Sequence, residues 1–300
     1  MNTIAAVILT KNEEKHIARC IGSLKNVCDE VIVVDSFSSD KTCEIAKSHG
    51  AEICRHAFVN HARQFNWALE HCDIKSEWIW RIDADEYLEG NIGSAVKEAV
   101  KKCDSDVNGI YVRKRIDFMG KPLKHGGWYP TYHLKVFRKG HGECENRWMD
   151  EHIRIFDGKT ITVDEGNQVD ANLNGLTWWT DKHNHYATRE MIDMLMTEFE
   201  LDAKGQEVIP MFFGTEEQRK RWLKMKYVKA PLFVRPFANF FYRYIIRGGF
   251  LDGKEGFIWH ILQGFWYRML VDAKIFEIKK KFNSNPEAIK EFLKDYLACS

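Results

Sequence analysis

The first hundred residues alternate short, mostly apolar runs with segments whose apolar residues recur every three to four positions. The runs cover 4–9, 31–34 and 78–82, and each is followed by polar residues. Runs of this length are typical of buried strands, whereas the helical spacing within 17–24 indicates a helix with one apolar face. The alternation predicts an α/β fold with a mostly parallel sheet that is covered by helices on both faces.

Further elements follow from capping residues and turn residues. Asn12 is a candidate N-cap, so we expect the first helix to begin directly after it. A second helix is expected over about 41–49 and would end at Gly50, a residue type that favours helix ends. A short strand over 52–54 and a helix over 63–71 complete this part of the pattern.

Two aspartates, Asp83 and Asp85, follow the third apolar run directly. Residues two apart on an extended chain point to the same side, so we expect both carboxylates to enter the space where open α/β sheets bind ligands. Mg²⁺ is usually held by one or two carboxylates together with substrate phosphates. The pair therefore predicts a site for Mg²⁺ or Mn²⁺ and a diphosphate, although chance and loop capping are alternative explanations of an isolated pair.

No glycine-rich phosphate loop is present. The sequence has neither GxGxxG after the first run nor GxxxxGK[ST] at any position. Phosphate must then be held in another way, and the aspartate pair with its cation supplies one. Asp35 ends the second run, where its carboxylate can accept hydrogen bonds from a base or a ribose. The alternative is a turn carboxylate that caps the next helix.

Three segments carry a resemblance to a known family: AVILTKNE at 6–13, VVDSFSSDKT at 33–42 and RIDADE at 81–86. They resemble the family 2 glycosyltransferases of GT-A fold, in particular the bacterial lipopolysaccharide-core β-glucosyltransferases. The resemblance covers the first half of the chain. It implies the GT-A nucleotide-diphospho-sugar transferase fold; the composition of the last third of the chain predicts a C-terminal helical appendage beside it. It also implies a hexosyltransferase that uses a nucleotide-sugar donor and a divalent metal and inverts the anomeric carbon.

The resemblance also implies roles for individual residues. The residues placed at the nucleotide sugar are Thr10, Asn12, Glu13, Asp35, Gln64, Asp83 and Asp85. The metal is expected on Asp85 and Asp83. Gln64 falls, with Asn66, where this subgroup has a polar pair near the donor; two amides on a helix surface are the alternative.

A glycine-rich aromatic loop lies between strands that we expect to begin at Gly109 and to cover 134–138. Its Trp128 and Tyr129 offer flat apolar faces with a polar edge, which suit a sugar ring. The subgroup has a similar Gly-Gly-Trp-Tyr-Pro stretch, so the resemblance implies an acceptor-binding role for Gly127, Trp128 and Tyr129. A hairpin turn with aromatic residues packed beneath it is the alternative.

An inverting transfer needs a carboxylate that takes the proton from the attacking acceptor hydroxyl. By the resemblance, Glu151 is the first candidate and Asp150 the second. Asp150 stands where the subgroup commonly has a histidine, so the choice between the two neighbours stays open, and a helix capped by Asp150 is the alternative. His183 and His185 form another polar cluster, for which we expect a structural role more than a metal one.

Composition changes in the last third of the chain. From 218 to 251 there are nine basic residues and no acidic one, interleaved with aromatic residues, although the whole chain has a net charge of only +1. Basic and aromatic residues mixed along a helix are typical of a segment that lies at an anionic membrane surface. The bulky apolar residues speak against nucleic-acid binding, and a helical hairpin packed on the sheet is the structural alternative.

These observations predict three parts: a nucleotide-binding half over 1–107 and an acceptor-binding half over 108–214, which together form the catalytic domain, and a membrane-associating region over 215–300. The eight cysteines form no C-x-x-C pair, no leader pattern precedes the first strand, and no apolar run is long enough to span a membrane. We therefore expect a cytoplasmic protein, peripheral on the inner face of the cytoplasmic membrane.

The predicted function is metal-assisted, inverting transfer of a sugar to a cell-surface glycan or lipid-linked acceptor. Two alternatives remain. A sugar nucleotidyltransferase would show a glycine-rich loop after the first strand, and residues 11–14 contain no glycine. A non-catalytic scaffold of the same fold at the membrane surface would not need the acidic residues at 83, 85 and 151.

Overall fold

The computed structural model describes residues 2–145, 151–199, 201, 211, 213 and 216–299. The described chain divides into two compact units, one with the residues up to Leu173 and one with those from Asn174 onward. This boundary precedes the change in composition after Gly214. The reason is that helix α5 (Leu176–Glu198) packs its buried apolar residues against helix α9 (Tyr267–Lys281) within the second unit.

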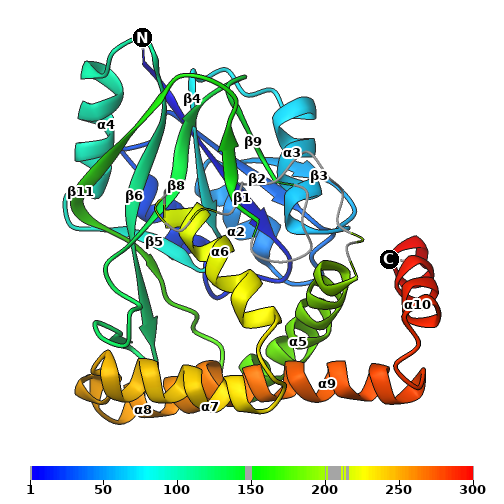
Figure 1. Ribbon diagram of the computed structural model, residues 1–300. Coiled ribbons are helices and arrows are strands. Elements are labelled where there is room, and N and C mark those ends of the chain that lie inside the picture. The colour runs from blue at the N-terminus through cyan, green and yellow to red at the C-terminus, as the bar shows by residue number, and fades with distance from the viewer. Residues whose placement is uncertain are drawn as a thin grey trace. The chain divides into compact units, whose positions relative to one another are not determined.

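The first unit is built on a mixed sheet (Figure 1). Its strands are β1 Ile4–Thr10, β2 Glu30–Asp35, β3 Glu52–Arg55, β4 Trp78–Asp83, β5 Glu86–Glu89, β6 Val107–Phe118, β7 Lys121–Pro122, β8 Thr131–Arg138 and β11 Lys159–Asp170. They lie in the order β3-β2-β1-β4-β8-β6-β11-β5, with β7 beside β6. The first three pairings, along β3, β2, β1 and β4, are parallel, whereas β8 runs antiparallel to both β4 and β6.

Helices cover both faces of this sheet, as predicted. The helices are α1 Ile17–Leu24, α2 Thr42–Ser48, α3 His61–His71 and α4 Ile92–Lys102. Ile4, Ala6 and Ile8 of β1 pack with α1, α2 and α4, whereas Ala5 and Val7 pack with α3 on the other face. Because both faces are buried, every position of the strand before Thr10 is apolar, and each large side chain removed from water contributes about 1.5–3 kcal/mol.

The sheet brings three of the sequence motifs to one edge. Thr10, at the end of β1, is in register with Asp35, at the end of β2, and Leu9 is in register with Asp83, at the end of β4. The carboxyl ends of three adjacent parallel strands therefore lie together, which is where open α/β sheets bind ligands.

The second unit is helical. Besides α5 and α9 it contains α6 Glu216–Val228, α7 Val234–Phe240, the π-helical turn η1 Phe241–Ile246, the 3-10 turn η2 Gly249–Asp252, α8 Gly253–Trp259, the π-helical turn η3 His260–Trp266 and α10 Pro286–Cys299. A buried ion pair fixes α7 to α9: Arg235 Nε donates to Asp272 Oδ1 at 2.8 Å, and the backbone N–H of Phe233 donates to Oδ2 at 2.7 Å. None of the helices described in either unit is both long and apolar enough to cross a membrane.

Candidate active site

Asp35 is buried at the end of β2 and already has several donors. Thr10 Oγ1 donates to Asp35 Oδ1 at 3.1 Å, and the backbone N–H of Ser38 donates to Oδ2 at 2.9 Å. Burial acts to raise the pKa of Asp35, but the hydrogen bonds from Ser38 and Thr10 prevail and lower it. The ionised carboxylate thus organises the loop after β2, as the turn alternative expects, while its contact with a nucleoside remains a prediction.

Asn12 does not cap a helix, and that prediction was wrong. Its backbone is left-handed, with φ of 56°, and helix α1 begins only at Ile17. The side-chain oxygen instead accepts a hydrogen bond from the backbone N–H of Ser39 at 2.8 Å. Asn12 therefore ties the loop after β1 to the loop after β2, so the two segments expected to contact the nucleoside form one surface.

Glu13, the next residue, is held by a histidine that the sequence did not single out. His16 is buried, and its Nδ1 lies 2.6 Å from Glu13 Oε2, while its Nε2 accepts the backbone N–H of Leu173 at 2.9 Å. Because Nε2 accepts, the ring proton lies on Nδ1 and is donated to Glu13. The imidazole thus joins the loop after β1 to the segment that follows β11.

Gln64 and Asn66 are both engaged inside the first unit. Gln64 is buried rather than on the helix surface; its Nε2 donates to Ser36 Oγ at 3.0 Å, and its Oε1 lies 2.8 Å from His56 Nδ1. Asn66 exchanges two hydrogen bonds of 2.8 Å with the backbone of Cys144. Gln64 therefore supports the loop after β2, whereas Asn66 fastens α3 to the hairpin of β9 (Gly142–Cys144) and β10 (Ile153–Ile155).

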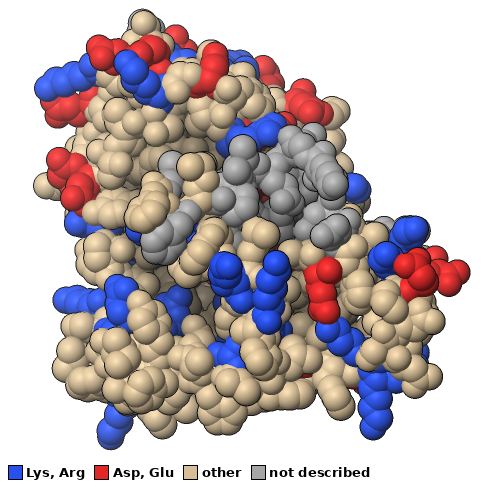
Figure 2. Space-filling model, in the orientation of Figure 1, with Lys and Arg blue, Asp and Glu red and all other residues tan. Residues whose placement is uncertain are grey.

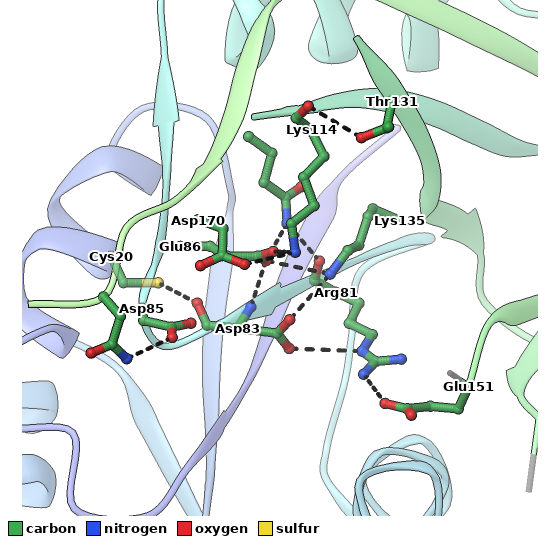
Figure 3. Close-up of polar contacts among 12 residues, drawn as sticks. Cys20, Arg81, Asp83, Asp85, Glu86, Lys114, Thr131, Lys135, Glu151 and Asp170 are labelled. Atoms are coloured by element: carbon green, nitrogen blue, oxygen red, sulfur yellow. Dashed lines mark hydrogen bonds and ion pairs between the residues drawn. The ribbon is translucent and has the colours of Figure 1, made fainter. Parts of the chain in front are cut away.

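The two aspartates lie at the end of β4, but not on one extended segment. The strand ends at Asp83, and the next two residues form a turn, so strand alternation does not place Asp85 and that part of the expectation was wrong. Asp83 Oδ2 lies 3.3 Å from Lys135 Nζ, and Oδ1 lies 3.9 Å from Arg81 Nε. Asp85 Oδ2 accepts from Asn172 Nδ2 at 3.0 Å (Figure 3). Separate partners therefore hold the two carboxylates.

A buried ionic network lies behind the aspartates (Figure 3). Glu86, with no exposed surface, accepts the backbone N–H of Asp83 at 2.9 Å and lies 2.9 Å from Lys114 Nζ and 3.3 Å from Lys135 Nζ. Lys114 also lies 3.1 Å from Asp170. Buried charges are stable only when they are paired, so Glu86 is the anion that keeps both lysines in place beside the turn.

The network has opposite effects on two carboxyl groups. Burial acts to raise the pKa of Asp83, but Lys135 and Arg81 hold it well below the usual range. Burial raises the pKa of Asp170 above its usual value, against the opposing attraction of Lys114. Asp83 is therefore ionised at neutral pH, which is the form that a cation or a basic side chain requires.

Arg81 connects the aspartate turn to the candidate base. Its guanidinium is buried, and Nη2 donates to Glu151 Oε1 at 2.8 Å while Nε faces Asp83 (Figure 3). Glu151 is far from Asp83 in sequence, yet a single guanidinium separates their carboxylates. Asp150, the second candidate for the base, lies outside the described residues.

The predicted acceptor loop of Gly127, Trp128 and Tyr129 lies directly before β8, which begins at Thr131 and also supplies a lysine to the ionic network. Gly127 has φ of 76°, a left-handed backbone that favours glycine. The guanidinium of Arg113 lies over the ring of Tyr129, 5.8 Å from its centroid. The loop is thus placed on the strand that borders the site, and its contact with an acceptor remains a prediction.

The sequence analysis missed several site residues: Arg81, Lys114, Lys135, Asp170 and Asn172. Lys135 carried a usable signal, because it stands between the apolar residues Leu134 and Val136 of β8, and a buried lysine must find a partner. Asp170 and Asn172 carried no comparable signal, since only the pairing of β11 with β5 and β6 brings the end of β11 to the aspartate turn.

The oxygen ligands at this turn fit a hard divalent cation. Among the described residues, no three His, Cys, Asp or Glu side chains form a metal cluster. A cation that also binds a diphosphate needs only one or two carboxylates, and Asp85 and Asp83 would be the ones to supply them. His183 belongs to the helical unit, where its ring stacks on Trp179 at 3.5 Å between centroids, and its structural role remains a prediction.

Comparisons with known proteins identify the family. The model of glycosyl transferase family 2 matches residues 5–156. An uncharacterised glycosyltransferase of Rickettsia typhi is 26% identical over 94% of this chain and 89% of its own length. The lipopolysaccharide core biosynthesis glycosyltransferase LpsC of Rhizobium meliloti is 26% identical over 91% of this chain and 92% of its own.

A solved structure supports the fold. The mannosyltransferase PcManGT of Pyrobaculum calidifontis, in complex with GDP-Man and Mn²⁺, is 15% identical and matches with a TM-score of 0.50 over 91% of this chain and 86% of its own. The strand order, the helices on both faces and the C-terminal helices agree with the GT-A-like fold that the resemblance implied. The chain therefore belongs to glycosyltransferase family 2 and is a glycosyltransferase enzyme.

Proposed function

We propose that this enzyme moves one hexose, with inversion, from a nucleotide-diphosphate sugar to a cell-surface glycan or lipid-linked acceptor. The observation that carries the proposal is the pairing of Asp83 and Glu151 across Arg81, at the carboxyl edge of the parallel strands. An inverting transfer needs a leaving-group site and a base on opposite sides of the reacting carbon, and these two carboxylates can serve those two roles. The name of the related LpsC supports an acceptor in the lipopolysaccharide core.

Asp85 and Asp83 are the residues that would hold Mg²⁺ or Mn²⁺. Bound there, the metal would offset the negative charge that develops on the leaving diphosphate. The Mn²⁺ and GDP-Man in the PcManGT structure support this assignment by likeness of fold. Lys135, beside Asp83, adds positive charge at the same end of β4.

Glu151 is proposed as the base that accepts the proton of the acceptor hydroxyl. A base must hold its carboxylate in one orientation, and the 2.8 Å hydrogen bond from Arg81 Nη2 to Oε1 supplies that constraint. The tie of His16 to Glu13 and the loop built by Asn12 would shape the nucleoside end of the same edge.

The proposal is tested by replacing the base while preserving its shape. We expect Glu151→Gln to lower kcat by about 10²- to 10⁴-fold, because proton transfer contributes on that order. Release of nucleoside diphosphate from a panel of nucleotide sugars is the measurement. Glu143→Gln is the matched control, since Glu143 lies on the neighbouring hairpin and pairs only with Arg154 among the contacts described.

Two results would count against the proposal. Full activity in Glu151→Gln would exclude Glu151 as the base. Release of pyrophosphate in place of nucleoside diphosphate would favour a nucleotidyltransferase. Binding of nucleoside diphosphate should be unchanged in Glu151→Gln, which separates loss of chemistry from loss of fold.

A further inference from the structure

The exposed large apolar side chains of this chain are concentrated in one segment of the helical unit. Of the 22 such residues in the described chain, ten lie within 233–257. They include Phe237, Phe241, Ile246, Phe250, Leu251 and Phe257. Single apolar residues are commonly exposed on protein surfaces. A contiguous group of them, in contrast, marks an interaction site.

The segment is a two-armed helical hairpin, residues 234–266, here called the apolar hairpin. Its first arm is α7 with η1, and its second is α8 with η3. The arms are joined by a hydrogen bond of 2.7 Å from Asn239 Nδ2 to the carbonyl of Gly264 and by a ring contact of 4.8 Å between Phe237 and Phe265. The two arms therefore already pack on each other, and the side chains named above are exposed with that contact in place.

The connection between the arms requires glycine. Gly248 has a left-handed φ of 70°, and a Cβ at Gly249 would lie 2.2 Å from the imidazole of His260. His260 has no exposed surface. The tight turn brings Phe250 and Leu251 to the tip of the hairpin, where 49% and 61% of their side chains are exposed.

Basic residues accompany this apolar surface. Arg243 lies on the first arm, Arg247 directly follows that arm, Lys254 follows the tip, and 218–251 contains no acidic residue. The nearest acid, Asp252, is buried. Burial and the neighbouring guanidinium groups of Arg268 and Arg247 lower the pKa of Arg243 to about 10. In Figure 2 the surface over α7 and α8 is largely tan with Lys and Arg at its margin.

We propose that the apolar hairpin is a membrane-binding surface that inserts Phe241, Ile246 and the tip residues among the headgroups of an anionic bilayer, with Arg243, Arg247 and Lys254 on lipid phosphates. Amphipathic segments of this composition lie in the interface and do not span it. A second copy of the chain fits less well, because a two-fold contact would place these basic residues against their own copies. The purpose of such binding rests on the proposed function, since a lipid-linked acceptor lies in the membrane.

The test is co-sedimentation of the full chain with vesicles of phosphatidylcholine with and without phosphatidylglycerol. We expect binding to the anionic vesicles, weakened by salt, and a loss of at least about ten-fold in affinity for Phe241→Ser/Ile246→Ser. The matched control is Met119→Ser/Phe156→Ser in the first unit. Its side chains are 57% and 53% exposed, against 57% and 62% for the test pair, and it should bind vesicles like the parent.

A charge-reversal pair tests the basic component. Arg247→Glu/Lys254→Glu should reduce binding by on the order of five-fold for each charge removed and weaken its salt dependence. Lys47→Glu/Lys101→Glu, on exposed helix positions of the first unit, is the control that should leave binding unchanged.

Two outcomes would overturn the inference. One is equal vesicle binding by the parent and by Phe241→Ser/Ile246→Ser. The other is concentration-dependent dimerisation that this variant abolishes, without any vesicle binding, which would make a second copy the occupant. Release of nucleoside diphosphate without vesicles should be unchanged in the variant. Vesicle binding without any transfer would leave this inference standing and defeat only the proposed function.

Discussion

At the scale of single residues, Arg81 is the side chain on which the site depends. It is buried in β4, pairs with Glu151 at 2.8 Å and faces Asp83, so one permanent positive charge serves two carboxylates. Arginine suits this position because its planar group can donate in several directions at once, which a lysine cannot reproduce. The guanidinium is therefore both a structural tie and a positioning element for the candidate base.

We expect Arg81→Met to lower both stability and turnover. Removing one partner of a buried ion pair costs about 3–5 kcal/mol of the free energy of unfolding, and we expect kcat to fall by more than about ten-fold. Urea denaturation and release of nucleoside diphosphate are the measurements. Arg81→Lys should recover more stability than turnover, because it restores the charge but not the geometry.

The control for this prediction is Arg154→Met, which breaks the half-exposed pair with Glu143. Such surface pairs contribute only about 0–1 kcal/mol. If Arg154→Met were as harmful as Arg81→Met, the special role of the buried guanidinium would be refuted.

At the scale of elements, the sequence predicts most clearly where one physical cause dominates. The strands β1, β2 and β4 were predicted because burial on both faces makes most of their positions apolar. The start of α1 was not predicted correctly. The side chain of Asn12 accepts a hydrogen bond from Ser39, in a loop that lies near it only in the folded chain. The lysines Lys114 and Lys135 were missed for the same reason, since their partner Glu86 lies on another strand.

The apolar hairpin carries a pH-dependent element. His260 is fully buried, neither ring nitrogen has a hydrogen-bond partner among the described residues, and burial with nearby Arg243 lowers its pKa to about 4. The unfolded chain binds a proton near pH 6.5 and the folded chain near 4. Between these values the unfolded state holds more protons, so stability falls as the pH falls through that window.

We therefore expect His260→Phe to flatten the pH dependence of unfolding between pH 6.5 and 4, by roughly 2–3 kcal/mol across the window. Urea midpoints at several pH values measure this. His185→Phe, on the exposed part of α5, should keep the slope of the parent. An unchanged slope in His260→Phe would show that another group titrates there.

At the scale of the whole molecule, the residues that the two proposals require lie in different units. The first unit carries the family motifs and the ionic site on a sheet, and the second carries the exposed apolar and basic residues. The near-neutral net charge of +1 conceals this division, because the acid-free stretch is balanced by carboxylates elsewhere. Sequence motifs predicted the chemistry of the first unit, whereas the boundary at Leu173 followed from packing of α5 that composition does not reveal.

The central claim is that Asp85, with Asp83, holds a divalent cation together with a diphosphate. The most direct test is the melting temperature of the protein with UDP or GDP, with and without Mn²⁺, since a ligand that binds only the folded state raises it. We predict a shift that needs both the diphosphate and Mn²⁺ in the parent and in the control Asp164→Ala, a pair partner of Arg113 away from the turn, and no such shift in Asp85→Ala. The same metal-dependent shift in Asp85→Ala would contradict the claim.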